Sequence, residues 1–247
     1  MTVSEEGTAH IWSSMAPVSS ATLNAGEAIE SVDLGAAGRL VVARCTWQEQ
    51  PLLWQRRGGP FHRMSLPTLP NAVRSARFAK GGVRLLLILN DGSGLIYDTA
   101  ADRVDVRLRC IEANEETETD PKIRFVRSAF SPSGDMFISR REDDHWTVQR
   151  ADGATIAVIA GENDTANFSP RESHLLLYRA GQRAQLWTTR TWTQVPISLV
   201  DDVSCSTFAF SGDDSLLAQQ CADGTLVVYD LATLDIVARF KACEVRP

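Results

Sequence analysis

The stretch Phe130-Ser-Pro-Ser-Gly-Asp-Met-Phe-Ile138 decides the fold, because related stretches recur along the chain. In it an apolar residue ends one expected strand, Ser, Pro, Gly and Asp supply a tight turn, and aliphatic residues begin a second strand. The related stretches begin at Leu34, Phe78, Phe168 and Phe210, so successive first residues lie 44, 52, 38 and 42 positions apart. This spacing indicates an internal repeat of about forty residues.

A second motif repeats with the same period. It is a short apolar run after a polar turn, closed in most copies by an aromatic residue. The closing residues lie 42, 43, 52, 38 and 42 positions apart. They are Trp12, Trp54, Tyr97, Gln149, Trp187 and Tyr229, with Gln149 closing a degenerate copy. Two independent markers therefore give one period, with one insertion.

Each period is expected to hold four short strands. The pairs Asp91-Gly92 and Asp223-Gly224 are hairpin signals between the second and third strands. A last strand is expected after each further turn, and Pro196 in one of them favours a strand at a sheet edge. These last strands are 104–108, 155–159, 194–197 and 236–240. Four strands in about forty residues predict a blade, so the fold class is all-β and the architecture a β-propeller.

The chain resembles the WD-repeat family. The resemblance rests on Phe130-Ser-Pro-Ser-Gly-Asp135, Phe168-Ser-Pro170 and Asp223-Gly-Thr-Leu-Val-Val-Tyr-Asp230, and on Tyr97-Asp98 where that family has Trp-Asp. The Gly-His pair that commonly opens a repeat in this family is absent. The family's buried Asp-His-Ser/Thr-Trp network is therefore not expected to be complete in any repeat.

Residues 1–247 are predicted to form a single propeller domain with an incomplete first blade. Because an open propeller exposes unpaired edges, we expect something to complete it. The alternatives are further blades or a domain from a longer parent chain, strands from a partner chain, or an irregular open arc. The predicted units are a partial blade at 1–23, blades at 24–68, 69–119, 120–160, 161–199 and 200–240, and a tail at 241–247.

Composition excludes some partners. The net charge of −6 gives no basic footprint for a nucleic acid. The longest apolar run, Leu85–Leu89, is far too short to span a bilayer, and the N-terminus has no apolar segment of a secretory signal. We therefore predict no nucleic acid, no membrane and a cytoplasmic location. The five cysteines, read mainly as small buried residues rather than a zinc site or disulfide scaffold, are Cys45, Cys110, Cys205, Cys221 and Cys243.

Several polar clusters have both a structural and a functional interpretation. The acidic segment Glu112–Asp120 is expected to be a solvated insertion, with an acidic docking loop as the alternative. Three Asp-Asp pairs and the segment Asn90–Gly94 are interpreted as turns rather than carboxylate or calcium sites. The pairs are Asp143-Asp144, Asp201-Asp202 and Asp213-Asp214.

Two further groups bear on binding. The basic residues Arg124, Arg127, Arg140 and Arg141 are interpreted as a solvated rim, with a grip for an acidic partner as the alternative. The tryptophans outside the repeat markers, which would be hot spots if exposed, are Trp47, Trp146 and Trp192. The sequence does not assign a protein-binding residue.

The sequence contains no Gly-x-Ser-x-Gly elbow, no His-Glu-x-x-His pair and no phosphate-binding glycine loop. No catalytic, cofactor-binding or metal residue is therefore predicted, and the protein is not expected to be an enzyme. The four histidines are spaced without a rule that would bring them together, although propeller sites are built from several blades. They are His10, His62, His145 and His174.

The WD-repeat resemblance implies a scaffold that binds other proteins without catalysis. Fold alone does not set function, so a second hypothesis from another class stays open. In it, the propeller is the sensor or gating part of a larger signalling NTPase or hydrolase. The sequence does not choose the partner or the face that it would bind.

Overall fold

The computed structural model describes residues 2–4, 6–12, 19–108, 128–140, 145–179, 182–200 and 205–241. Within these ranges the regular structure consists of β-strands and one 3-10 turn, Ala36–Gly38. The all-β prediction is therefore confirmed. The chain divides into two compact units: β1 to β11 belong to the first, and β13 to β23 to the second, which also holds Ala129 and Phe130 of β12.

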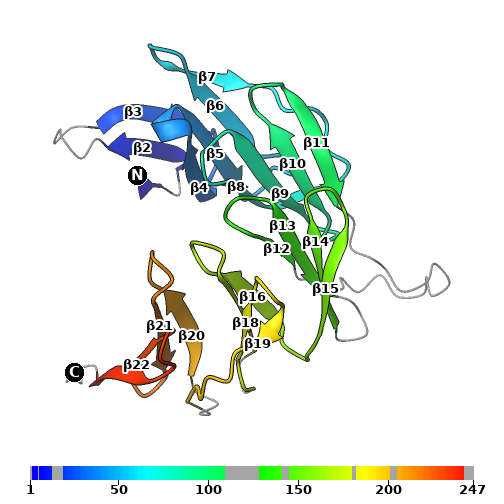
Figure 1. The fold of residues 1–247 in the computed structure, drawn as a ribbon. Coiled ribbons are helices and arrows are strands. Elements are labelled where there is room, and N and C mark those ends of the chain that lie inside the picture. Colours follow the sequence, from blue (N-terminus) through cyan, green and yellow to red (C-terminus); the bar gives the residue numbers. More distant parts are fainter. Residues whose placement is uncertain are drawn as a thin grey trace. The chain divides into compact units, whose positions relative to one another are not determined.

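The first unit holds three antiparallel sheets (Figure 1). One has three strands in the order β1-β2-β3, and the other two have the orders β4-β5-β6-β7 and β11-β10-β9-β8. The strands are β1 (Thr2–Val3), β2 (Thr8–Trp12), β3 (Ser19–Asn24), β4 (Ile29–Gly35), β5 (Leu40–Cys45), β6 (Leu52–Arg56), β7 (Phe61–Met64), β8 (Val73–Phe78), β9 (Arg84–Leu89), β10 (Gly94–Asp98) and β11 (Arg103–Leu108).

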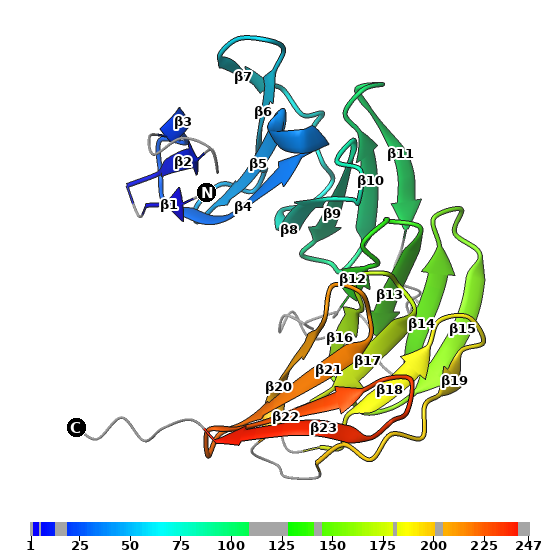
Figure 2. The ribbon, with the colours of Figure 1, turned by 60° about the vertical axis from the view of Figure 1, so that its left-hand side comes forward.

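The second unit also holds three antiparallel sheets, each with four strands (Figure 2). Their orders are β12-β13-β14-β15, β16-β17-β18-β19 and β20-β21-β22-β23, so consecutive strands are always neighbours. The strands are β12 (Ser128–Phe130), β13 (Met136–Arg140), β14 (His145–Arg150), β15 (Thr155–Ala160), β16 (Thr165–Phe168), β17 (His174–Tyr178), β18 (Gln185–Thr188), β19 (Thr193–Gln194), β20 (Cys205–Phe210), β21 (Leu216–Cys221), β22 (Thr225–Asp230) and β23 (Ile236–Lys241).

The predicted grouping into four strands is confirmed for five of the sheets in the described ranges. Each closing residue of the second motif lies in β2 or in the third strand of a four-stranded sheet. In four sheets the pairing with the following strand shifts register directly before that residue, as a β-bulge does. The four residues are Trp12, Tyr97, Gln149 and Tyr229. The repeat is therefore visible in the backbone as well, as a β-bulge at the same position in these four sheets.

Two details differ from the sequence prediction. The strand expected at 194–197 stops at Gln194, because Pro196 has no N–H to continue the ladder. At the N-terminus, where a partial blade was predicted, Thr2–Val3 pairs with β2, so the sheet has three strands.

Each unit has its own hydrophobic core between its sheets. In the first unit, Leu53 packs with Leu87 and Tyr97, and Val41 packs with Ile11. In the second unit, Leu175 packs with Trp146, and Leu186 packs with Tyr229. These sets contain side chains with almost no exposure, each worth about 1.5–3 kcal/mol of burial. Burial of both faces explains why the middle strands have continuous apolar runs.

Gly35 shows how closely two sheets of the first unit approach. A Cβ at this position would lie 2.5 Å from the ring of Phe78, so a side chain does not fit.

Among the described residues, no helix is long and apolar enough to cross a membrane. The structure does not test whether residues 1–247 form a single propeller domain, nor where its blades begin and end, so both stay predictions.

Candidate interaction surface

Three turns of the second unit share one hydrogen-bond pattern. In each, the N–H of the serine after the phenylalanine donates to the carbonyl of the residue that begins the next strand. The Oγ of that serine accepts the N–H of the same strand residue. The serines are Ser131, Ser169 and Ser211, and the strand residues are Met136, His174 and Leu216. The same sequence pattern thus forms the same turn at three places in the second unit.

The fourth residue after the phenylalanine has a left-handed backbone in every one of these turns. Its φ is 80° at Gly134, 62° at Glu172 and 62° at Asp214. Glycine adopts this conformation freely, whereas other residues lose roughly 1–2 kcal/mol. The two acidic residues therefore occupy a strained position, and their side chains show what stabilises it.

The Asp214 carboxylate links its own turn to the turn of the preceding sheet. It accepts hydrogen bonds from Ser169 Oγ (2.5 Å), Ser173 Oγ (2.6 Å), the Arg171 N–H (2.9 Å) and the Ser173 N–H (3.2 Å). Asp214 is 8% exposed. Burial alone would raise the pKa of Asp214, but the hydrogen bonds from Ser169 and Ser173 lower it. The aspartate is thus held ionised at the junction of two sheets.

Glu172 repeats this link one sheet earlier. Its carboxylate accepts hydrogen bonds from the N–H and the Oγ of Ser133, the latter at 3.0 Å. In the first unit, Asp33 accepts the N–H of Phe78 at 2.7 Å and so also joins two sheets near such a turn. Carboxylates therefore fix the relation between neighbouring sheets at three places in the described chain.

The contact of Ser173 with His174 and Asp214 resembles the composition of a catalytic triad, but its geometry differs. The Ser173 Oγ lies 2.8 Å from His174 Nδ1, and it donates to Asp214 instead of leaving that carboxylate to orient the histidine. Burial lowers the pKa of His174, while the charge of Asp214 opposes this. A nucleophile needs a base that is itself oriented by the acid. We therefore interpret these residues as a link between turns.

Asp213 is confirmed as a turn residue. Its carboxylate accepts hydrogen bonds from Ser211 Oγ (2.6 Å) and from the Ser215 N–H (3.1 Å) within the same turn. These bonds lower the pKa of Asp213, the one from Ser211 most of all. The pair Asp213-Asp214 was predicted only to form a turn, so the link from Asp214 to the preceding sheet was missed.

Other predicted turns also form. In the segment Asn90–Gly94, Asp91 accepts the Ser93 N–H at 2.9 Å, and Gly92 has a φ of 79°. At the second Asp-Gly pair, Asp223 accepts the Thr225 N–H at 2.8 Å. The pairs Asp143-Asp144 and Asp201-Asp202, the segment Glu112–Asp120, and Arg124, Arg127 and Arg141 lie outside the described residues, while Arg140 ends β13.

A buried polar network joins Tyr229 and Gln219 to the backbone of Val200. The Tyr229 hydroxyl donates to Gln219 Oε1 (2.9 Å) and accepts the Val200 N–H (2.9 Å), and Gln219 Nε2 donates to the Val200 carbonyl (3.0 Å). The network ties β21 and β22 to the segment before β20. The sequence did not predict this network, because glutamine and tyrosine at these positions follow no recognisable spacing.

The three tryptophans outside the repeat markers have different environments. Trp146 is fully buried, and its Nε1 donates to the Asn163 carbonyl at 3.2 Å. Trp192 packs against the core that contains Trp146. Trp47, in contrast, is 83% exposed in the loop between β5 and β6. Only Trp47 therefore meets the condition of exposure for an interface hot spot.

Neither the histidines nor the cysteines form a metal site in the described ranges. No three His, Cys, Asp or Glu side chains there lie close enough together to hold a metal ion. Cys45 is a free buried thiol, as expected, and burial raises its pKa. Cys221 is also buried, but it is disulfide-bonded, which the wide cysteine spacing did not predict. The residue opposite Cys221 in the β20–β21 ladder is Cys205.

Neither a protein-family model nor a curated protein matches this chain.

Proposed function

We propose that the protein is a non-enzymatic scaffold that binds other proteins, and that its sheets are blades of a WD-repeat-type β-propeller. The support is the repetition itself. Five four-stranded sheets have consecutive strands as neighbours, and a bulge recurs at a fixed place in the third strand. Four-stranded antiparallel sheets repeated along one chain are typical of propellers.

The observation that carries the proposal is the set of three turns at Ser131, Ser169 and Ser211, which carboxylates link to one another. Its backbone is fixed by Asp214 and Glu172, while Pro170, Arg171 and Ser215 on the same turns are exposed. A rigid surface loses little conformational entropy when a partner binds. The turns therefore suit a binding surface better than an active site.

We propose protein partners rather than nucleic acid or membrane, and a cytoplasmic location. The disulfide at Cys221 bears on the location, because structural disulfides are rare in the cytosol. If the protein is cytoplasmic, we expect Cys221 to be a free thiol in the cell that forms the disulfide only on exposure to air. Alkylation of freshly lysed native cells should then find Cys221 reduced. Recovery of the Cys221 peptide as a disulfide under acid quench would contradict the proposed location.

The test of function is affinity purification of the tagged chain from its native source, followed by quantitative mass spectrometry. We expect stoichiometric protein partners, and we expect Arg171→Glu to reduce the recovery of at least one of them. Arg107→Glu is the matched control, since Arg107 is an exposed arginine of β11, in the other compact unit. Recovery of no stoichiometric partner, or equal recovery with both variants, would contradict binding through this surface.

A further inference from the structure

Four arginines gather at one end of the β4–β7 sheet. Arg56 ends β6, Arg57 follows it and Arg63 lies in β7. The Arg56 N–H donates to the Arg39 carbonyl at 2.8 Å, which places Arg39 beside Arg56 across the strands. We name these four residues the arginine hairpin.

The strand register places three of the four arginines on one face of the sheet. Arg56 pairs with Phe61, and Trp54 pairs with Arg63. Paired residues share a face, and residues two apart along a strand return to it. Arg39, Arg56 and Arg63 therefore lie on the same face as Phe61, with Arg56 directly opposite it.

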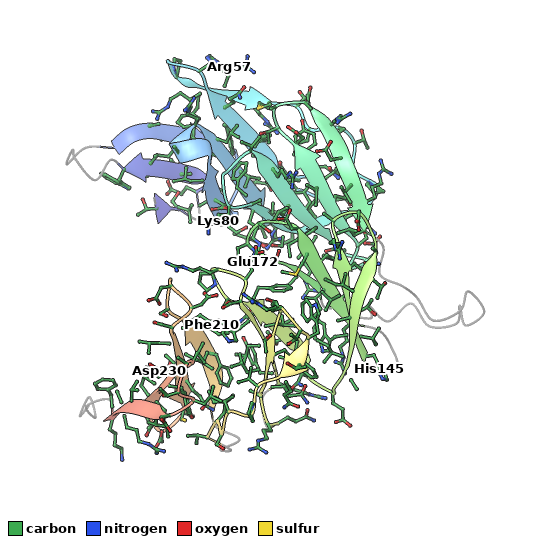
Figure 3. The ribbon with its side chains drawn as sticks, viewed as in Figure 1. Arg57, Lys80, His145, Glu172, Phe210 and Asp230 are labelled. Carbon is green, nitrogen blue, oxygen red and sulfur yellow. The ribbon has the colours of Figure 1, made fainter. Side chains whose placement is uncertain are left out.

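Two of the guanidinium groups are held in place. The guanidinium carbon of Arg56 lies 5.0 Å from the centroid of the Phe61 ring, within the range of a cation–π contact. Arg57 Nε donates to Gln55 Oε1 at 2.9 Å. Figure 3 shows Arg57 at the end of the β6–β7 hairpin. The contacts orient the side chains and leave most of their N–H donors available.

The arginine hairpin has no carboxylate partner among the described residues. The nearby ion pair of this sheet joins Arg44 to Glu30, and the carboxylate of Asp33 accepts the N–H groups of Leu34 and Phe78. Arg39, Arg57 and Arg63 are exposed, and Arg56 is half-buried. Unpaired arginines are notable in a chain with 31 acidic and 25 basic residues.

We propose that the arginine hairpin binds an acidic segment of a partner protein. This inference rests on the proposed function and specifies one partner surface. Guanidinium groups bind carboxylates through two parallel hydrogen bonds, and Phe61 offers an apolar contact between them. A short acidic peptide covers only the hairpin, whereas a nucleic acid or an anionic membrane would also face the excess negative charge of the chain.

The experiment measures fluorescence anisotropy of a labelled peptide of alternating glutamate and glycine. The test variant is Arg39→Gln/Arg56→Gln/Arg63→Gln. The control variant, Arg107→Gln/Arg150→Gln/Arg190→Gln, makes the same charge change at exposed sites on other sheets. We expect the wild type and the control to bind with an affinity that falls as salt rises, and the test variant to bind at least tenfold more weakly. A glutamine–glycine peptide should not bind.

The proposal is overturned if the test and control variants, both shown by circular dichroism to be folded, bind the peptide equally. It is also overturned if the wild type binds a DNA duplex or phosphatidylserine vesicles more tightly than the peptide at equal ionic strength. Affinity purification separates the two proposals. If the test variant recovers every partner of the wild type, the hairpin inference is wrong and the scaffold function stands. If the wild type recovers no partner while the peptide still binds, the scaffold function is wrong.

Discussion

Asp214 combines a strained backbone with a buried charge. A left-handed φ and a desolvated carboxylate both disfavour the folded state, so the four hydrogen bonds to Asp214 have to outweigh them. A buried carboxylate gains more from each donor than a neutral acceptor does. We therefore expect Asp214 to contribute more to stability than the exposed carboxylates of the same turn.

Replacing Asp214 with Asn tests this directly. Asn has the same shape as Asp, but its amide NH₂ is a donor. It would face the Ser169 and Ser173 hydroxyls, which donate to the carboxylate in the wild type. We expect Asp214→Asn to lower the free energy of unfolding by about 3 kcal/mol in urea titrations followed by circular dichroism. The control is Asp213→Asn, which changes an exposed carboxylate of the same turn and should cost less. An equal loss in the two variants would show that the cross-sheet bonds are unimportant.

The contribution of Asp214 should depend on pH. Hydrogen bonds hold its pKa below the ordinary aspartate value, although burial opposes them. Its stabilisation is therefore complete above the pKa of the unfolded chain, about 3.9, and is lost as the pH falls through the lower folded value. We expect the difference in unfolding free energy between wild type and Asp214→Asn to be constant near neutral pH and to shrink in acid. A constant difference down to about pH 2 would contradict this.

At the scale of elements, Tyr229 joins two strands to the segment that precedes their sheet. Its hydroxyl both accepts the Val200 N–H and donates to Gln219. We expect Tyr229→Phe to cost about 1–2 kcal/mol, because Gln219 loses a buried donor and the Val200 N–H loses one of its two acceptors. Tyr178→Phe is the control, since the Tyr178 hydroxyl accepts only an exposed bond from Asn167. Thermal melts of both variants would give the comparison, and an equal shift would refute it.

The elements differ in how well the sequence predicts them. The turns around Ser131, Ser169 and Asp91 follow from residues that are close in the chain, so local pattern sufficed. Glu172 and Asp214 make their decisive contacts with residues 39 to 45 positions away. A sequence period shows that sheets repeat, but it does not say which side chains of adjacent sheets meet. The carboxylate links of Glu172 and Asp214 and the Tyr229 network could therefore not be predicted from the sequence.

At the scale of the whole molecule, each of the two units has hydrophobic clusters of its own. We expect Asp214→Asn to raise amide hydrogen exchange in β16 to β23 and to leave β4 to β11 unchanged, as mass spectrometry of peptides would show. The wild type at the same pH and temperature is the reference. A uniform increase over both units would mean that they unfold as one cooperative body.

The carboxylate links also order events during synthesis. The turn that contains Ser169 acquires its partner only when Asp214 has been made, 45 residues later, and Ser133 waits 39 residues for Glu172. The ribosome exposes the chain from the N-terminus at about 5–20 residues per second. The turns of the β12–β15 and β16–β19 sheets therefore emerge without their later partners and spend seconds in that state. A pause in translation between two repeats would prolong the exposure of the earlier one.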